Sequence, residues 1–187
     1  MENKRVLIAY GTRSGATEEI AQEIAKTLNE KGLKTQILNL GDTKTKHWQC
    51  ADDFEGILIG TSLRINKWKK EVKSFISKNI KELEDETKKL GFFTCSGEGA
   101  SNPDKARDAI LTRLMDEFGI KPDIHDAFGG LIDLSEDSNL SGITKKMLRM
   151  AAPEMESDGI KLDLEGRNDF RDWDQIHSFV EDFAAML

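Results

Sequence analysis

The stretch Val6-Leu7-Ile8-Ala9-Tyr10-Gly11-Thr12-Arg13-Ser14-Gly15-Ala16-Thr17 sets the arrangement of the rest of the chain. Its first five residues form a short apolar run that is typical of a buried strand, and residues 18–31 have the apolar spacing of an amphipathic helix. The pattern therefore predicts a strand, a tight turn and a helix. The turn offers glycines, hydroxyl groups and the unpaired N–H groups of a helix start, which together suit a phosphate.

The same turn has a plainer interpretation, in which Thr17 caps the helix while Gly11 and Gly15 only make the turn. Its position favours the phosphate, because ligands of α/β proteins bind beyond the carboxyl ends of the strands. The sequence has no Gly-Lys-Ser or Gly-Lys-Thr, so a single phosphate suits this turn better than a nucleoside triphosphate.

The composition predicts one globular domain over residues 1–187, with 38% hydrophobic residues and a net charge of -7. The acidic balance argues against nucleic-acid binding, which needs clustered lysine and arginine. The chain enters its first strand without an apolar leader and has no run long enough to cross a bilayer, so we expect a cytoplasmic protein without an integral membrane segment. Cys50 and Cys95 stand alone, and the three histidines are scattered, which suggests neither a disulfide framework nor a zinc site.

Further strands are predicted at residues 34–39, 56–61, 90–94 and 123–128, and they alternate with helices that begin near Trp68 and Asp104. A short helix is possible in the polar segment 40–53, with Trp48 as its core anchor. Alternating strands and helices favour a parallel sheet with right-handed crossovers. The loops after the first, third and fourth strands, including a glycine-bearing loop at residues 95–103, should converge on one crevice. A flat cofactor with a phosphate tail would fit there.

The segment from Leu131 to Arg167 has the least regular pattern. An amphipathic helix that packs over the sheet is predicted by Leu140, Ile143, Met147, Leu148 and Met150, and in the alternative its methionines form an adaptable docking surface. Further on, Asp172 and Gln175 form a capping pair that predicts the start of a final helix. The neighbouring residues that we expect to anchor this helix, without a chemical role, are Asp169, Arg171 and Trp173.

Four motifs, in this order along the chain, carry a resemblance to a known family: residues 10–17, Gly60-Thr61-Ser62-Leu63-Arg64, Phe128-Gly129-Gly130 and Asp169-Phe170-Arg171-Asp172-Trp173. The chain resembles, over nearly its whole length, the flavodoxin-domain family that includes menaquinone-dependent protoporphyrinogen dehydrogenase. The resemblance implies a flavodoxin-like three-layer sandwich with a central five-stranded parallel sheet and a C-terminal helical extension. It also implies FMN as a noncovalent cofactor.

The resemblance further implies which residues surround FMN. Around the phosphate it places Thr12, Arg13, Ser14, Gly15, Ala16 and Thr17. Beside the isoalloxazine it places Ser62, Leu63, Arg64 and Trp68, and on the other side of the ring Thr94, Cys95, Ser96 and Gly97. Two of these residues keep a second interpretation: Trp68 also has the spacing of a core residue of the following helix, and Arg64 could be a solvated surface cation.

The chain departs from the protoporphyrinogen enzyme between Thr94 and Ala106. That enzyme has a longer, basic loop there that suits a membrane surface, whereas this chain has a shorter loop with Glu98 and Asp104. The difference argues against quinone-linked porphyrin oxidation. Together with the acidic balance, it favours a soluble partner or a small redox substrate.

Two functions follow from the resemblance. The first is an FMN-dependent oxidoreductase that passes electrons to or from a quinone or another small acceptor, with no acid–base pair of its own and the chemistry in the flavin. The second is a non-enzymatic electron carrier between protein partners, which the acidic balance supports. A receiver-like signalling domain of similar topology would need clustered acids after the first strand, where this chain has Ala9-Tyr10-Gly11. The sequence leaves the oligomeric state open.

Overall fold

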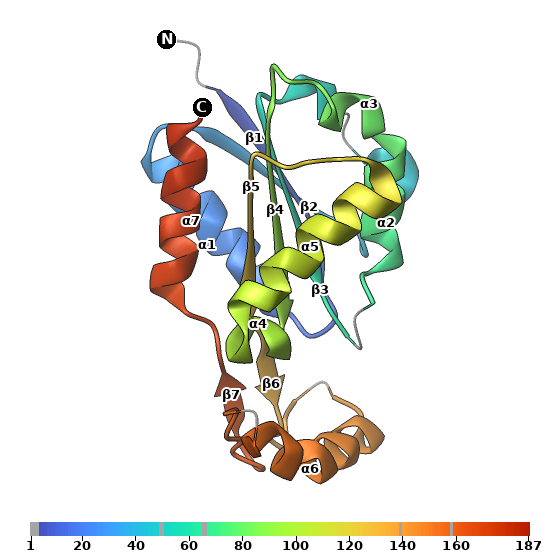
Figure 1. Ribbon diagram of the computed structural model, residues 1–187, viewed down its shortest axis with the longest axis vertical. Helices are drawn as coiled ribbons and strands as arrows, with labels where there is room; N and C mark the ends of the chain where they lie inside the picture. The colour runs from blue at the N-terminus through green and yellow to red at the C-terminus, as the bar shows by residue number, and fades with distance from the viewer. Residues whose placement is uncertain (1–3, 49–50, 65–66, 139, 158) are drawn as a thin grey trace.

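A five-stranded parallel sheet forms the centre of the protein. The computed structural model describes residues 4–48, 51–64, 67–138, 140–157 and 159–187, so Cys50 lies outside the described residues. The sheet order is β2-β1-β3-β4-β5, and all neighbouring strands run parallel (Figure 1). The strands are β1 (Arg5–Gly11), β2 (Lys34–Asn39), β3 (Gly56–Ser62), β4 (Lys89–Ser96) and β5 (Ile124–Gly129).

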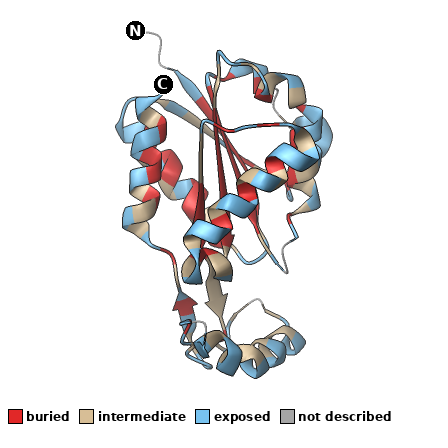
Figure 2. Cartoon of the chain, in the orientation of Figure 1, coloured by how far each residue is buried: buried red, intermediate tan, exposed pale blue. Residues whose placement is uncertain are grey.

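Helices cover both faces of this sheet (Figures 1 and 2). One face carries α1 (Ala16–Glu30) and α7 (Trp173–Ala185), and the other carries α2 (Lys70–Lys78), α3 (Ile80–Leu83) and α5 (Pro103–Phe118). Because successive side chains of a strand point to opposite faces, Val6 and Ile8 of β1 join the cluster under α1 and α7, whereas Leu7 joins the cluster under α2 and α5. The predicted three-layer α/β sandwich with a C-terminal helix is confirmed.

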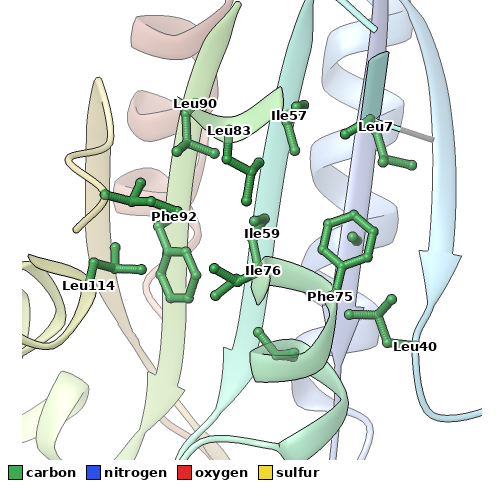
Figure 3. Packing of buried hydrophobic residues seen from close by; sticks show 14 of the residues in the cluster. Leu7, Leu40, Ile57, Ile59, Phe75, Ile76, Leu83, Leu90, Phe92 and Leu114 are labelled. Atoms are coloured by element: carbon green, nitrogen blue, oxygen red, sulfur yellow. The ribbon is translucent and has the colours of Figure 1, made fainter. Parts of the chain in front are cut away.

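The cluster under α2 and α5 explains why the central strands are continuous apolar runs in the sequence: helices bury these strands on both faces of the sheet. Every residue of β3 is buried, and Ile57 and Ile59 belong to the same cluster as Phe75 and Ile76 of α2 (Figure 3). Trp48 packs edge-on against Phe75, with ring centroids 5.7 Å apart, and is half-buried. Segment 40–53, where a short helix was possible, instead contains two 3-10 turns at Thr45–His47 and Ala51–Asp53.

Gly60 in β3 lies under the ring of Phe93. A Cβ added at this position would come within 2.3 Å of the Phe93 ring, and the sheet leaves the backbone no room to move away. We therefore expect Gly60→Ala to lower the free energy of unfolding by about 1–3 kcal/mol through overpacking. Gly142→Ala is the matched control, since a Cβ there would meet no atom within 4 Å. Urea unfolding of both variants checks this expectation, and equal stability of the two would contradict it.

The segment predicted as a glycine-bearing loop at residues 95–103 is mostly regular structure, so that prediction is wrong. β4 continues to Ser96, and α4 (Gly97–Ser101) follows directly and leads into α5. The Ser96 hydroxyl accepts a hydrogen bond from the Gly99 N–H at 2.9 Å and thereby caps α4. Gly99 lies so close to the Phe128 carbonyl that a Cβ would come within 2.2 Å of its oxygen. A glycine is therefore needed at position 99 because α4 packs closely against β5, and not because a loop is flexible.

The amphipathic helix predicted after Leu131 forms, but it does not pack over the sheet, and that part of the prediction is wrong. The segment makes a lobe, residues 131–169, beyond the carboxyl ends of the strands (Figure 1). We call it the C-terminal lobe. It contains the antiparallel strands β6 (Leu131–Asp133) and β7 (Arg167–Asp169) and the helix α6 (Gly142–Ser157). α6 faces solvent with Ile143, Met147 and Met150, which are 77%, 59% and 73% exposed.

Hydrogen bonds within the C-terminal lobe explain this position of α6. Lys145 donates to the carbonyls of Ser135 and Glu136, and Arg149 donates to the carbonyls of Leu134 and Leu164. The basic side chains of α6 therefore bind the neighbouring turns of the lobe. Both faces of the sheet are already covered, one by α1 and α7 and the other by α2, α3 and α5.

The final helix α7 is capped by Asp172, as predicted. The Asp172 carboxylate accepts hydrogen bonds from the N–H groups of Asp174 and Gln175, at 3.0 and 3.1 Å. The reciprocal half of the predicted capping pair is wrong, because the Gln175 side chain donates to the Asp126 carboxylate of β5 at 3.0 and 3.1 Å. Gln175 thus ties α7 to the sheet. Within the described residues, no helix combines the length and the apolar character that crossing a bilayer requires.

Candidate functional site

The candidate site lies where the direction of the sheet connections reverses. From β1 the chain crosses to β2 at one side, and from β3 it proceeds through β4 to β5 at the other side. The loops after β1 and β3 therefore leave the sheet on opposite sides of a crevice at the carboxyl ends of these strands. In open α/β sheets this crevice is where ligands bind.

Residues Thr12–Gly15, which we call the phosphate loop, join β1 to α1. Gly15 has a φ of +89° and precedes the first helical residue, and its N–H donates to the Thr12 hydroxyl at 3.0 Å. No side chain caps α1. The interpretation that Thr17 caps this helix is therefore wrong. The first-turn N–H groups of Ala16, Thr17 and Glu18 have no partner within the helix and favour an anion.

Thr17 lies one residue inside α1 and is completely buried. Its hydroxyl has no nitrogen or oxygen partner among the described residues, and the Cys95 thiol of β4, a weak hydrogen-bonding group, is its polar neighbour. A buried hydroxyl with so weak a partner leaves hydrogen-bonding capacity for a ligand or water. Together with the uncapped helix start, it is the part of the site that best suits a phosphate.

Arg13 spans the crevice from the phosphate loop to the chain after β3. Its guanidinium donates to the Ser62 carbonyl, to the Ser62 hydroxyl at 3.1 Å and to the Lys67 carbonyl at 3.0 Å. Burial, and next to it the charge of Arg64, lower the pKa of Arg13. The side chain thus holds the two loops together, and it lies near a second cation where an anionic ligand is expected.

The segment after β3 holds three of the expected site residues. Ser62 is buried and accepts from Arg13, and the Leu63 N–H donates to the Cys95 carbonyl of β4 at 3.0 Å. Arg64 is exposed and forms an isolated antiparallel bridge with Lys67. These contacts place the segment at the mouth of the crevice, with the half-buried Leu63 beside the end of β4.

Trp68 is a core residue, which is the second of the two interpretations that the sequence allowed. The indole is 5% exposed and stacks on Phe92 of β4, with ring centroids 4.8 Å apart, and on Phe118 of α5 at 6.4 Å. The Arg113 guanidinium lies 5.4 Å from the centroid of the indole. In this arrangement the indole faces belong to the core under α2 and α5, so Trp68 offers a flavin little surface.

The residues expected on the other side of the ring form the end of β4 and the start of α4. Thr94 is completely buried, and its hydroxyl has no partner among the residues described. Burial raises the pKa of the Cys95 thiol to about 12, so the thiol stays protonated and is no nucleophile at neutral pH. Ser96 and Gly97 bring the start of α4 to the same sheet edge as the phosphate loop.

An ionic cluster connects the start of α1 to the C-terminal lobe. From the sequence, its residues were assigned no chemical role. Glu19, in the first turn of α1, binds Arg167 at 3.0 Å and Arg171 at 2.8 Å. Arg171 also holds Asp169 through two hydrogen bonds and lies 4.7 Å from the ring centroid of Trp173. The expectation that Asp169, Arg171 and Trp173 anchor the last helix agrees with these contacts. No local signal could have paired Glu19 with residues about 150 positions later.

Fold and crevice together define a flavodoxin-type α/β protein. Over residues 7–159 the chain matches the flavodoxin domain family, and it belongs to that family. The family that the sequence motifs indicated is therefore confirmed.

Among curated relatives, the chain is similar to protoporphyrinogen IX dehydrogenase (quinone) of Escherichia coli strain K12. The two are 28% identical over 79 residues, which is 42% of this chain and 42% of that enzyme. The similarity thus spans less than half of that enzyme's length.

Solved structures share the fold. A flavodoxin of Streptococcus pneumonia TIGR4 superposes with a TM-score of 0.53 at 15% identity, covering 98% of this chain and 99% of that one. The two-electron reduced flavodoxin of Megasphaera elsdenii has a TM-score of 0.50 at 24% identity, covering 65% of this chain and 84% of that one.

Proposed function

We propose that this chain binds FMN without a covalent bond and acts as a flavin-dependent redox protein. The observation that carries the proposal is the uncapped start of α1, where a phosphate loop meets the buried Thr17 hydroxyl, whose neighbour is only the weakly bonding Cys95 thiol, at the point where the sheet connections reverse. In this assignment the loop N–H groups and the hydroxyls of Thr12, Ser14 and Thr17 bind the phosphate. Gly15 and Ala16 allow the close approach.

The ring of the flavin would lie between the segment after β3 and the end of β4. Ser62, Leu63 and Arg64 form one wall, and residues 94–97 form the other. Bound flavin supplies the redox chemistry, while the protein contributes orientation and electrostatics. Arg64, exposed at the mouth of the crevice, is the group that can contact the ring or an anionic substrate.

We further propose that the protein is an oxidoreductase that exchanges electrons with a quinone or another small acceptor. The partial similarity to a quinone-linked dehydrogenase supports this choice. A carrier that exchanges electrons with protein partners is the second candidate, and the net charge of -7 supports it, because an acidic surface steers basic partners.

One experiment tests the proposal and separates the two candidates. Purified protein is mixed with FMN, desalted, and titrated with reductant under anaerobic conditions while its absorption spectrum is recorded. We expect the flavin bands to survive desalting and the reduction to proceed in one two-electron transition, as suits an enzyme. Two resolved one-electron transitions would favour the carrier. Complete loss of the flavin on desalting, with no quenching of FMN fluorescence by added protein, would overturn both.

A further inference from the structure

Three cations border the mouth of the crevice, and we call them the cationic rim: Arg13, Arg64 and Lys67. Arg13 comes from the phosphate loop, whereas Arg64 and Lys67 pair with each other through backbone hydrogen bonds of 3.3 and 3.0 Å in the segment after β3. All three residues are exposed. Since the whole chain has a net charge of -7, the rim has the opposite sign from the protein as a whole.

Arg13 is the member of the rim whose charge is held in a fixed place. Its guanidinium donates to the carbonyls of Ser62 and Lys67 and to the Ser62 hydroxyl, and all of these acceptors are neutral. Among the described residues, Arg13 forms no ion pair. Neutral acceptors position the guanidinium without cancelling its charge, and arginine stays protonated at neutral pH. Arg13 thus places an uncompensated positive charge within hydrogen-bond distance of the wall assigned to the flavin ring.

The other two rim cations add to this charge. In the described part of the chain, neither Arg64 nor Lys67 forms an ion pair. Burial, and after it the charge of Arg64, lower the pKa of Arg13, so the two guanidinium groups lie close enough to repel each other. A group of like charges with no anion between them gains free energy when a ligand brings negative charge to it.

The acidic side chains around the crevice offset this positive charge only in part. Three of them have cations of their own: Glu71 pairs with Lys69 at 3.4 Å, Glu98 with Lys105 at 2.7 Å, and Glu19 with Arg167 and Arg171. Glu18 is hydrogen-bonded to the Tyr10 hydroxyl and lies on the α1 side of the phosphate loop. The three rim cations therefore outnumber the one acid that no cation compensates.

The chemistry of FMN makes the sign of this charge consequential. Oxidised FMN that takes up two electrons and one proton gains one negative charge on its ring, whereas the charge of its phosphate stays the same. A positive charge that is already in place beside the ring stabilises the more negative state, and charges near the ring are one of the means by which a protein tunes a flavin. The attraction between the rim and the phosphate cancels in the reduction potential, because both redox states share it.

We propose that the cationic rim, with Arg13 as its fixed member, raises the two-electron reduction potential of bound FMN. The inference rests on the proposed flavin function and deepens it. A higher potential makes the bound flavin a better acceptor of an electron pair. Arg13 thereby has a role beyond binding the phosphate, since its charge acts on the difference between the two redox states of the ring.

The test measures the midpoint potential of FMN-loaded protein by titration with dithionite in the presence of a reference dye of known potential. We expect Arg13→Gln to lower the preference of the protein for reduced over oxidised FMN by about tenfold or more. For a two-electron couple this corresponds to a drop of about 30 mV or more. The size follows from Coulomb's law, because one charge within about 10 Å changes an equilibrium by about this factor at an effective dielectric constant near 20.

Three further variants separate the charge from other causes. Arg13→Lys keeps the charge but not the planar fork of donors, so its potential should stay near that of the parent. Arg64→Gln leaves the hydrogen bonds of Arg13 in place and should lower the preference for reduced FMN by about threefold, less than Arg13→Gln because water screens an exposed charge. Lys34→Gln is the matched control: it removes an exposed positive charge at the first residue of β2, at the opposite end of the sheet, and should change nothing.

Each outcome has one meaning. A potential that falls in Arg13→Gln and stays in Arg13→Lys and Lys34→Gln supports the inference. An unchanged potential in Arg13→Gln overturns it and leaves the proposed function standing. Equal drops in Arg13→Gln and Arg13→Lys, or in Arg13→Gln and Lys34→Gln, also overturn it, because the hydrogen bonds or the net charge would then be the cause. If Arg13→Gln retains no FMN, Arg64→Gln decides alone, and an unchanged or higher potential there overturns the inference. Failure of the parent to bind FMN overturns the proposed function and the inference with it.

Discussion

Ser14→Asp should release the flavin from this protein. Ser14 is exposed in the phosphate loop, so its side chain can change without disturbing the core. An aspartate there places a negative charge a few ångströms from the phosphate. At about 4 Å the repulsion per pair of charges is about 1 kcal/mol in water and about 4 kcal/mol at an effective dielectric constant near 20. The expected loss of FMN affinity therefore reaches about a thousandfold.

Ser14→Asn is the matched control for this prediction, because it has nearly the same size and shape without the charge. Fluorescence quenching measures FMN affinity for the three proteins, and urea unfolding shows whether the fold is kept. We expect Ser14→Asn to retain most of the affinity and both variants to unfold as the parent does. Undiminished FMN binding by Ser14→Asp would refute the assignment of the phosphate loop.

Arg171→Met should destabilise the fold more than the removal of any other single charge in the ionic cluster around Glu19. The Arg171 side chain is 2% exposed and lies between the carboxylates of Glu19 and Asp169. Removing one partner of a buried ion pair costs about 3–5 kcal/mol, because the remaining charge loses its compensation. Since both carboxylates keep contact with solvent, we expect a loss of about 3 kcal/mol, at the lower end of that range.

Arg167→Met provides the comparison, because Arg167 binds the same Glu19 but its side chain is 51% exposed. Exposed ion pairs contribute about 0–1 kcal/mol, so this variant should unfold nearly as the parent does. Adding Glu19→Gln and Asp169→Asn to Arg171→Met should recover much of the lost stability, since no carboxylate is then left unpaired. Urea unfolding of the parent, Arg167→Met, Arg171→Met and the triple variant measures these changes in the free energy of unfolding. Equal losses for Arg167→Met and Arg171→Met would show that burial of the ion pair is not the cause.

The order of strands and helices could be predicted because its signals are local. A buried parallel strand such as β3 is apolar on both faces, and α1 shows its buried stripe in its own spacing. The position of the phosphate loop could be predicted for the same reason, because a glycine turn between a buried parallel strand and the next helix lies at the carboxyl end of that strand. Even there, the sequence could not show that Arg13 would reach across to Ser62 and Lys67.

The features that could not be predicted depend on partners far away in the chain. The glycines at 97 and 99 indicate flexibility when only their neighbours are considered, whereas Gly99 is required by the Phe128 backbone. The amphipathic pattern of α6 signals a buried face, but it cannot reveal that the helix binds the lobe's own turns while Ile143 and Met150 remain in solvent. Trp68 had two interpretations because packing and stacking on a ligand require the same residue type.

The packing of α7 on α1 has a consequence for synthesis of the protein. Ile20 and Ile24 of α1 share their cluster with Ile176, Phe179 and Val180 of α7, roughly 150 residues later in the chain. Ribosomes add about 5–20 residues per second, so the apolar surface that α7 covers stays open for on the order of ten seconds while the chain is being made. During that interval the nascent chain exposes an apolar face on α1, the kind of transiently exposed surface that chaperones shield.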